Sequence, residues 1–404
     1  MGGWRIVAAA IGPGLMAAVV PMVSPSPVPA VVSCPYVTTP TIPPTPASPV
    51  RDPAAPVLGG PQLDTTGLAI APGVPAPPAL SAISWVVADL DTGEVLGACD
   101  AHLRRRPASV QKLLLAQTAL PELDPDRMVE ATADDVALPP HSSAVGLLVG
   151  GHYPVSTLWY GLLLESGNDA ANALARVAGG DGGVPATVAA MNAEAHRLGA
   201  EDTHAVTPSG LDAPDQFTSA YDLALIARAD FARQDFVRYD TMLRMQWPAQ
   251  PPRDPRGFQI QNENKLLISY AGALGGKTGF TDEARHTYVG AAQRGGRRLV
   301  VTLMGAEVVP VRGWQQGAML LDWGFGLPAT ASVGDLVTPD EVSRLHSSPP
   351  PTPAPAGTGT VRAAPAAAST SSGGFTLIVL LLAALLVIAV VCLRLIRRAV
   401  RRVR

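Results

Sequence analysis

The chain has 404 residues, of which 47% are hydrophobic and only 16% are charged. So much apolar side chain can bury a sizeable core, which excludes a wholly disordered protein. The formal net charge of -3 excludes a polybasic nucleic-acid binder. Forty prolines and 39 glycines are more than one compact fold uses, and we expect linkers around a folded core.

The first 30 residues are typical of a secretory signal peptide. Arg5 supplies the positive start, an apolar stretch covers 6–23, and Val28 and Ala30 flank a proline at a small-residue cleavage site. An uncleaved N-terminal anchor is the alternative. Because export is the better interpretation of this pattern, we expect the bulk of the chain outside the cytoplasm.

Two proline-rich stretches read as linkers. Residues 31–80 contain thirteen prolines, and 347–374 is a run of Pro, Ala, Ser, Thr and Gly. We expect both to be extended spacers that bury little apolar surface. Cys34 and Cys99 lie outside the apolar segments, and in an oxidising compartment they either pair or remain free thiols.

The remaining segment, 81–346, has the size of one catalytic domain. A strand over 85–90, a turn and a second strand over 94–98 predict a β-hairpin, and Pro107 opens a helix. Helical patterns follow at 158–164, 170–177, 185–198, 218–233 and 313–322, and strands at 272–280, 286–293 and 298–305. Strands at both ends with helices between them predict an antiparallel sheet with a helical part.

The C-terminal end predicts a single membrane anchor. Residues 375–393 carry no charge, and as a helix they would measure about 28 Å, close to the hydrocarbon thickness of a bilayer. Six arginines follow in 394–404, which places this tail in the cytoplasm by the positive-inside rule.

Ser109-Val110-Gln111-Lys112 is the first candidate for chemistry. Residues three apart on a helix share a face, so the Lys112 amine can reach the Ser109 hydroxyl. A lysine activates such a hydroxyl when its pKa is lowered, and a helix N-terminus or a second ammonium nearby lowers it. A capping serine and a surface lysine are the alternative for an isolated motif of this kind.

Two further motifs lie downstream. Ser166-Gly167-Asn168 places a hydroxyl and an amide at a break between two helices, where they could relay a proton and orient a carbonyl. Lys277-Thr278-Gly279 ends an apolar strand; its cation and hydroxyl suit a carboxylate, and its glycine lets a substrate backbone pair with the strand. An ordinary turn explains either motif taken alone.

The three motifs together, in this order, resemble the serine-type D-alanyl-D-alanine carboxypeptidases of peptidase family S11, the low-molecular-weight penicillin-binding proteins. The matching segments are PASVQK (107–112), LLLESGNDAANALA (162–175), GLD (210–212), NENKLL (262–267), GGKTGFTDEA (275–284) and RRLVVTLMGAE (297–307). The resemblance implies an α+β, β-lactamase/D,D-peptidase-like fold with an antiparallel sheet flanked by helices and a helical subdomain.

The same resemblance implies removal of the terminal D-alanine from peptidoglycan stem pentapeptides through an acyl-enzyme that β-lactams trap. By this resemblance Ser109 is acylated, Lys112 is the base and Ser166 relays protons. Asn168 holds the substrate amide, and the carboxylate end is bound by Lys277, Thr278, Gly279 and Arg312. The backbone N–H groups of Ser109 and Phe280 form the oxyanion hole.

Some residues depart from the family pattern. Ser209 stands where relatives usually have histidine, and Arg285-His286 replaces a common glycine-aromatic pair. A class A β-lactamase would carry Ser-Asp-Asn, but the middle residue here is Gly167. A membrane-bound penicillin sensor would need a cytoplasmic signalling domain, which 394–404 is too short to form. A structural wall-binding protein would not need both lysines.

Other chemistries are poorly supported by the sequence. The seven histidines form no H-E-x-x-H pattern, so we expect no metal and no cofactor. The G-x-S-x-G motif of a serine triad is also missing. Arg104-Arg105-Arg106 could meet an anionic wall polymer, but a solvated charge run is the better interpretation. The expected partners are the stem peptide, β-lactams and the membrane, and not nucleic acid.

Overall fold

The computed structural model describes residues 32–40, 46–47, 49–50 and 58–347. The signal peptide predicted over 1–30, the membrane helix over 375–393 and the tail over 394–404 lie outside these residues. Among the described residues, no helix combines the length and the apolar character that crossing a bilayer requires.

An antiparallel sheet forms the centre of the domain. In the described part of the chain it has seven strands. Along the sheet they are ordered β1 (Leu68–Ile70), β3 (Glu94–Cys99), β2 (Ser84–Asp89), β10 (Arg297–Ala306), β9 (Arg285–Arg294) and β8 (Ala273–Thr281), and β11 (Gly334–Asp335) also pairs with β3. In register, Val301 of β10 lies opposite Val87 of β2 and Gly290 of β9. Strand β8, which carries the Lys277 motif, is therefore an edge strand.

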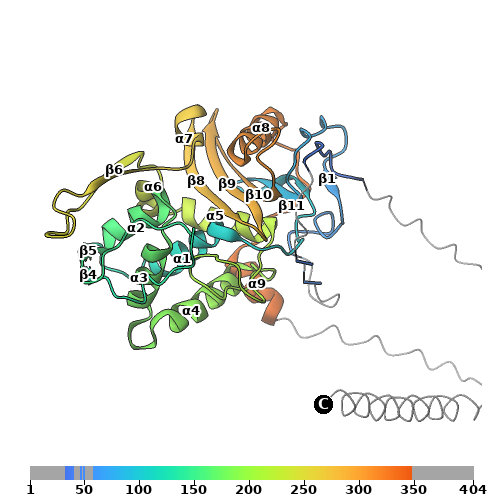
Figure 1. Cartoon of the computed structure of the whole chain (residues 1–404). Helices are drawn as coiled ribbons and strands as arrows, with labels where there is room; N and C mark the ends of the chain where they lie inside the picture. Colours follow the sequence, from blue (N-terminus) through green and yellow to red (C-terminus); the bar gives the residue numbers. More distant parts are fainter. Residues whose placement is uncertain (1–31, 41–45, 48, 51–57, 348–404) are drawn as a thin grey trace, which may run out of the picture. The chain divides into compact units, whose positions relative to one another are not determined.

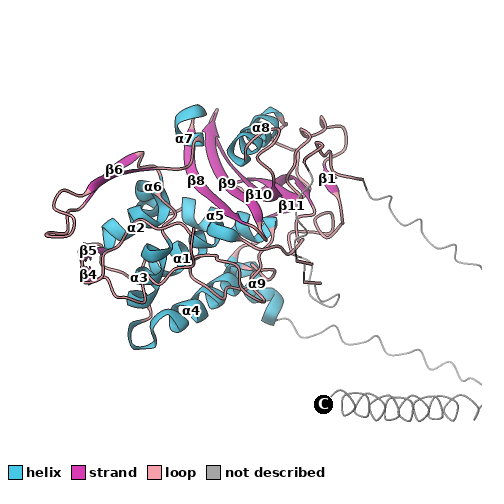
Figure 2. Ribbon diagram, in the orientation of Figure 1, coloured by secondary structure: helices cyan, strands magenta, loops and turns pink. Residues whose placement is uncertain are grey.

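Helices cover both faces of this sheet (Figures 1 and 2). Helix α8 (Gly313–Gly326) packs on β9 and β10 from one side, and α5 (Ala220–Phe231) packs on β10 and β2 from the other. Alternating side chains of each strand face these two layers, so Leu299 and Val301 join the α8 side while Val300 joins the α5 side. Helix α5 begins where the Ser219 hydroxyl accepts a hydrogen bond from the N–H of Asp222 at 3.1 Å.

A helical subdomain lies beyond α5 (Figure 1). Its elements are η1 (Ala108–Val110), α1 (Gln111–Ala119), α2 (Val155–Leu164), α3 (Asn168–Ala178), η2 (Gly180–Gly182), α4 (Gly183–Leu198) and α6 (Gln234–Asp240), with two small hairpins, β4 (Met128–Glu130) with β5 (His152–Pro154) and β6 (Arg244–Trp247) with β7 (Phe258–Gln261). Short helix α7 (Leu266–Ser269) precedes β8, and α9 (Pro339–Ser347) ends the described chain. The predicted antiparallel sheet with a helical part is confirmed.

The prediction that 31–80 is an extended spacer is wrong for much of that segment. Cys34 and Cys99 form a disulfide, β1 pairs with β3, and the side chains of Leu58, Leu63 and Leu80 are buried. Proline is tolerated beside an edge strand because no backbone N–H is needed there, so a proline-rich composition did not prevent folding.

Breaking the disulfide should destabilise the domain. The bond joins two cysteines that are 65 residues apart in the sequence. Closing a loop of that size lowers the conformational entropy of the unfolded chain, which stabilises the folded domain by about 4 kcal/mol. We expect a Cys34→Ala/Cys99→Ala variant to lose about that much free energy of unfolding, measured with a chemical denaturant. Reductant should weaken the wild type similarly and leave the variant unchanged; equal stability of both oxidised proteins would contradict the prediction.

Candidate active site

Ser109 and Lys112 lie at the start of the helix that follows Pro107. Ser109 is in the 3-10 turn η1 and Lys112 is in the first turn of α1, so the two side chains share one face. The Lys112 Nζ donates to the Ser109 Oγ at 2.8 Å. Ala108 has a positive φ of 50°, a conformation that costs a non-glycine residue energy and is common at functional sites.

The Lys112 amine is enclosed by protein. It is 0% exposed and donates two further hydrogen bonds, to Asn168 Oδ1 at 2.7 Å and to the backbone carbonyl of Ser209 at 2.8 Å. Burial, and then the positive charge of Lys277, hold the pKa of Lys112 well below its ordinary value. The predicted second ammonium is confirmed as one cause, although burial has the larger effect.

Ser166 and Asn168 lie at the junction of α2 and α3. Ser166 has a φ of 60° and is buried, and its Oγ has no hydrogen-bond partner among the described residues. The Asn168 amide reaches Lys112, and the Asn168 backbone N–H donates to the carbonyl of Ser143 at 2.9 Å. The break between the helices thus presents a free hydroxyl and, two residues on, the amide that binds the Lys112 amine.

Asp169 holds a loop beside this junction, a role that the sequence motifs did not predict. Its carboxylate is buried and accepts hydrogen bonds from the backbone N–H groups of Val145, Gly146 and Leu147 at 2.8–2.9 Å. An acidic residue in the first turn of a helix is ordinarily explained by the helix dipole. Here the same carboxylate also holds the loop whose preceding residues line the cleft.

The third motif approaches from the sheet. Lys277 is buried at 1% exposure, and its Nζ donates to the carbonyl of Thr278 at 3.0 Å. Burial lowers its pKa to about 8, while the carboxylates of Glu263 and Asp240 act in the opposite direction. A Cβ on Gly279 would lie 2.8 Å from the backbone N of Ser109. Glycine is needed there because β8 passes so close to the turn that carries Ser109.

These segments enclose one cleft of about 610 Å³. Its lining includes most of the predicted site residues, namely Ser109, Ser166, Asn168, Thr278, Gly279, Phe280 and Arg312. Lys112 and Lys277 do not line it, because each is buried behind the surface of the cleft. The structure therefore brings all the predicted site residues to one place, with the two amines beneath the floor.

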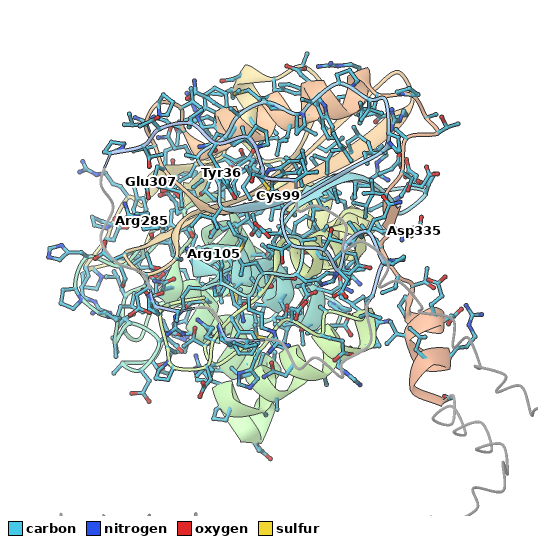
Figure 3. The ribbon with its side chains drawn as sticks, turned by 90° about the vertical axis from the view of Figure 1, so that its right-hand side faces the viewer. Tyr36, Cys99, Arg105, Arg285, Glu307 and Asp335 are labelled. Carbon is cyan, nitrogen blue, oxygen red and sulfur yellow. A yellow bond between two sulfur atoms is a disulfide. The ribbon has the colours of Figure 1, made fainter. Side chains whose placement is uncertain are left out.

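Of the residues that depart from the family pattern, His286 lines this cleft, and Ser209 and Arg285 are chain neighbours of lining residues. Arg285 pairs with Glu307 through two contacts of 2.7 and 3.0 Å, and Figure 3 shows the two side chains together. The Arg285 Cζ lies over the Phe280 ring, 5.5 Å from its centroid, and the centroid of the His286 ring lies 4.5 Å from the centroid of the same ring. These residues shape the rim beside Phe280, whereas Ser209 supplies a backbone carbonyl to Lys112.

The arginine run before η1 is largely neutralised. Arg104 Nε lies 2.9 Å from Asp202 Oδ1, and Arg106 Nε lies 3.0 Å from Glu283 Oε2. These pairs favour a structural role for the run over the binding of an anionic polymer. Among the described residues, the His102, Asp202 and Asp222 group has the composition of a metal site, but none of the three lines the cleft.

The comparisons with known proteins agree with this geometry. The family model of the D-alanyl-D-alanine carboxypeptidases, Peptidase_S11, matches residues 72–308. The chain belongs to this family. The match begins at residue 72, inside the segment expected to be a linker, and it includes the buried Leu80.

Curated relatives and solved structures carry the same description. DacB2 of Mycobacterium tuberculosis, named a D-alanyl-D-alanine carboxypeptidase, is 46% identical over 258 residues, which cover 63% of this chain and 85% of the relative. DacD of Salmonella typhimurium is 37% identical and covers 64% of this chain, which spans 66% of DacD. A crystal structure of the Mycobacterium tuberculosis D-alanyl-D-alanine carboxypeptidase matches with a TM-score of 0.61 at 44% identity, covering 65% of this chain and 98% of that one.

A Streptomyces enzyme described as a DD-transpeptidase has the same fold. Its structure matches with a TM-score of 0.59 at 28% identity, covering 63% of this chain and all of that one. The proteins that this chain resembles are therefore named for hydrolysis and for transfer, and the shared part is the domain that contains the cleft.

Proposed function

We propose that Ser109 is the nucleophile with which this serine-type D-alanyl-D-alanine carboxypeptidase removes the terminal D-alanine of peptidoglycan stem pentapeptides. The observation that carries the proposal is the 2.8 Å contact between the Ser109 Oγ and the buried Lys112 amine. An amine with a lowered pKa is neutral in part of the population at neutral pH, and in that form it can accept the hydroxyl proton.

In the acylation step, Lys112 takes the proton of Ser109 and the Oγ attacks the carbonyl carbon of the penultimate D-alanine. The backbone N–H groups of Ser109 and Phe280 stabilise the negative charge on the carbonyl oxygen. The bond to the terminal D-alanine then breaks, and its nitrogen receives a proton through Lys112 and Ser166. Water later hydrolyses the ester and returns the proton to Ser109.

The other residues hold the substrate during these steps. Asn168 holds the substrate amide, because its side chain is fixed by Lys112 at the cleft surface. Thr278 and Arg312 line the cleft and receive the terminal carboxylate, and the charge of the buried Lys277 ammonium attracts it from behind Thr278. Edge strand β8 pairs with the substrate backbone beside Gly279. Binding of a β-lactam at the same residues would leave Ser109 acylated.

Penicillin labelling tests the assignment. We expect intact-mass spectrometry to show one penicilloyl adduct per chain, peptide mapping to place it on Ser109, and Ser109→Ala to abolish it. The same variant should release no D-alanine from a synthetic pentapeptide while keeping the melting temperature of the wild type. An adduct on another residue, or full activity of Ser109→Ala, would refute the assignment.

We also propose that the catalytic domain is extracytoplasmic and anchored by the apolar segment 375–393. The Cys34–Cys99 disulfide supports an oxidising compartment, and the arginines of 394–404 support a cytoplasmic tail. The penicillin label should therefore follow the membrane fraction for the full chain and the soluble fraction for a chain ended at residue 374. Penicillin label in the soluble fraction for both the full chain and the shortened chain would contradict the anchor.

A further inference from the structure

Two glycines precede Lys277 on β8, and both have backbone conformations that other residues rarely adopt. Gly275 has a φ of 125° and Gly276 a φ of 135°. The pairing of β8 with β9 also shifts register between Ala273 and Gly275. An irregularity of this kind bends a strand and changes the direction of the next side chain, which here is Lys277.

The carboxyl group of Asp240 lies directly behind this segment. Asp240 is the last residue of α6 and is 0% exposed. Its Oδ2 accepts a hydrogen bond from the N–H of Gly276 at 2.6 Å. A Cβ on Gly275 would lie 2.0 Å from the same oxygen. The Asp240 carboxylate therefore leaves room only for glycine at position 275, and Gly276 supplies the N–H that this carboxylate accepts.

Asp240 is also fixed from its other side. The Asn262 Nδ2 donates to the Asp240 backbone carbonyl at 2.8 Å, and the Asn262 Oδ1 accepts from the N–H of Asn264 at 2.9 Å. The end of α6 is thereby tied to the segment that leads into α7 and β8. This leaves the Asp240 carboxylate little freedom to move away from Gly276.

Charged and titratable groups face Asp240 from several elements. They are Asp230 on α5, Lys277 on β8 and Tyr288 on β9. Burial, together with the charge on Asp240, raises the pKa of Asp230 well above its usual value, and burial raises the pKa of Tyr288. Burial raises the pKa of Asp240 to about 7, against the opposing effects of the Gly276 N–H and of Lys277.

Lys277 is the cation of this group. Its pKa is about 8 because burial lowers it more than the carboxylates of Glu263 and Asp240 raise it. Glu263 lies on the cleft side, where it lines the surface, whereas Asp240 lies behind the strand. Glu263 has the larger effect on the pKa of Lys277, and Asp240 is the fully buried one of the two carboxylates that stabilise the Lys277 ammonium.

We propose that Asp240 is a positioning residue for Lys277: its carboxylate fixes the Gly275–Gly276 segment, and its negative charge stabilises the Lys277 ammonium whose charge attracts the substrate carboxylate. The inference rests on the proposed function of Lys277. It makes Asp240 a determinant of substrate binding without any contact between Asp240 and the substrate.

Asp240→Asn separates the two effects, because an amide oxygen still accepts from Gly276 but carries no charge. The pKa of Lys277 should then fall by about one unit, and the alkaline limb of kcat/KM for a pentapeptide should move from near pH 8 to near pH 7. At pH 8 we expect kcat/KM to be about fivefold lower, mainly through KM. Below pH 6, where Asp240 is protonated in the wild type, the two enzymes should agree.

Asp230→Asn is the matched control. It is also buried, but neither of its carboxylate oxygens has a hydrogen-bond partner among the described residues. The charges that shift the pKa of Lys277 are those of Glu263 and Asp240, so replacing Asp230 should leave the pH profile in place. Asp240→Ala, which also removes the acceptor for Gly276, should lose activity at every pH.

The outcomes are distinct. If the wild type releases no D-alanine, the proposed function fails; if the wild type is active and Asp240→Asn keeps the wild-type alkaline limb, only this inference fails. If Asp240→Asn does not fold, NMR of the wild type decides, because the Gly276 amide signal should titrate with a midpoint near pH 7. A Gly276 signal that is constant between pH 6 and pH 8 would overturn the inference.

Discussion

Replacing Lys112 with methionine is expected to lower the rate of Ser109 acylation about 10³-fold or more, because methionine has a similar length but no basic nitrogen. Lys112 is 0% exposed, and it is the side chain whose amine lies 2.8 Å from the Ser109 Oγ. The second-order rate constant of penicillin acylation measures the loss, and the melting temperature shows whether the variant folds.

Two further variants separate the loss of a base from the loss of a positive charge. Lys112→Arg keeps a cation but cannot release its proton near neutral pH, so its acylation rate should fall by a similar factor. Lys265→Met removes a lysine that is exposed and that makes no hydrogen bond to Ser109 in the described chain. The decrease in acylation rate that this variant causes should be at least a hundredfold smaller than that of Lys112→Met. A Lys112→Arg enzyme that acylates at the wild-type rate would exclude Lys112 as the base.

The sequence was sufficient to predict how the main site residues meet. The three-residue spacing of Ser109 and Lys112 places both on one helix face, and the apolar strand before Thr278 places the third motif on the sheet. These signals are local, or they come from motifs whose order is specific to a family. Because a run of apolar and β-branched residues is also a local signal, most of the strands of the central sheet were predicted within one or two residues.

Other features depend on contacts that leave no local pattern. The carbonyl of Ser209 holds Lys112, but every residue has a carbonyl, so the sequence does not mark it. Asp169 and Asp240 act on backbone N–H groups more than 20 residues away. Strand β1 has only three residues, which is too short for alternation to be recognised within a proline-rich segment.

Replacing Gly279 with alanine is expected to lower acylation of Ser109 about a hundredfold. A Cβ at this position would lie 2.4 Å from the Thr287 Oγ1 and 2.8 Å from the Ser109 backbone N. Thr287 cannot turn away without losing its 2.8 Å hydrogen bond to the carbonyl of Pro107. Strand β8 must therefore move from the Ser109 turn, and a shift of about 1 Å is enough to cost that much in rate.

Gly326→Ala is the control for this substitution, because a Cβ at Gly326 would meet no atom within 4 Å. This variant should acylate at the wild-type rate, and both variants should keep the far-ultraviolet circular dichroism of the wild type. A Gly279→Ala enzyme that remains within about threefold of the wild-type rate would show that β8 can move away from Ser109 without harm. In that case the close approach of β8 would serve packing, and the oxyanion hole would not depend on the absence of a side chain at Gly279.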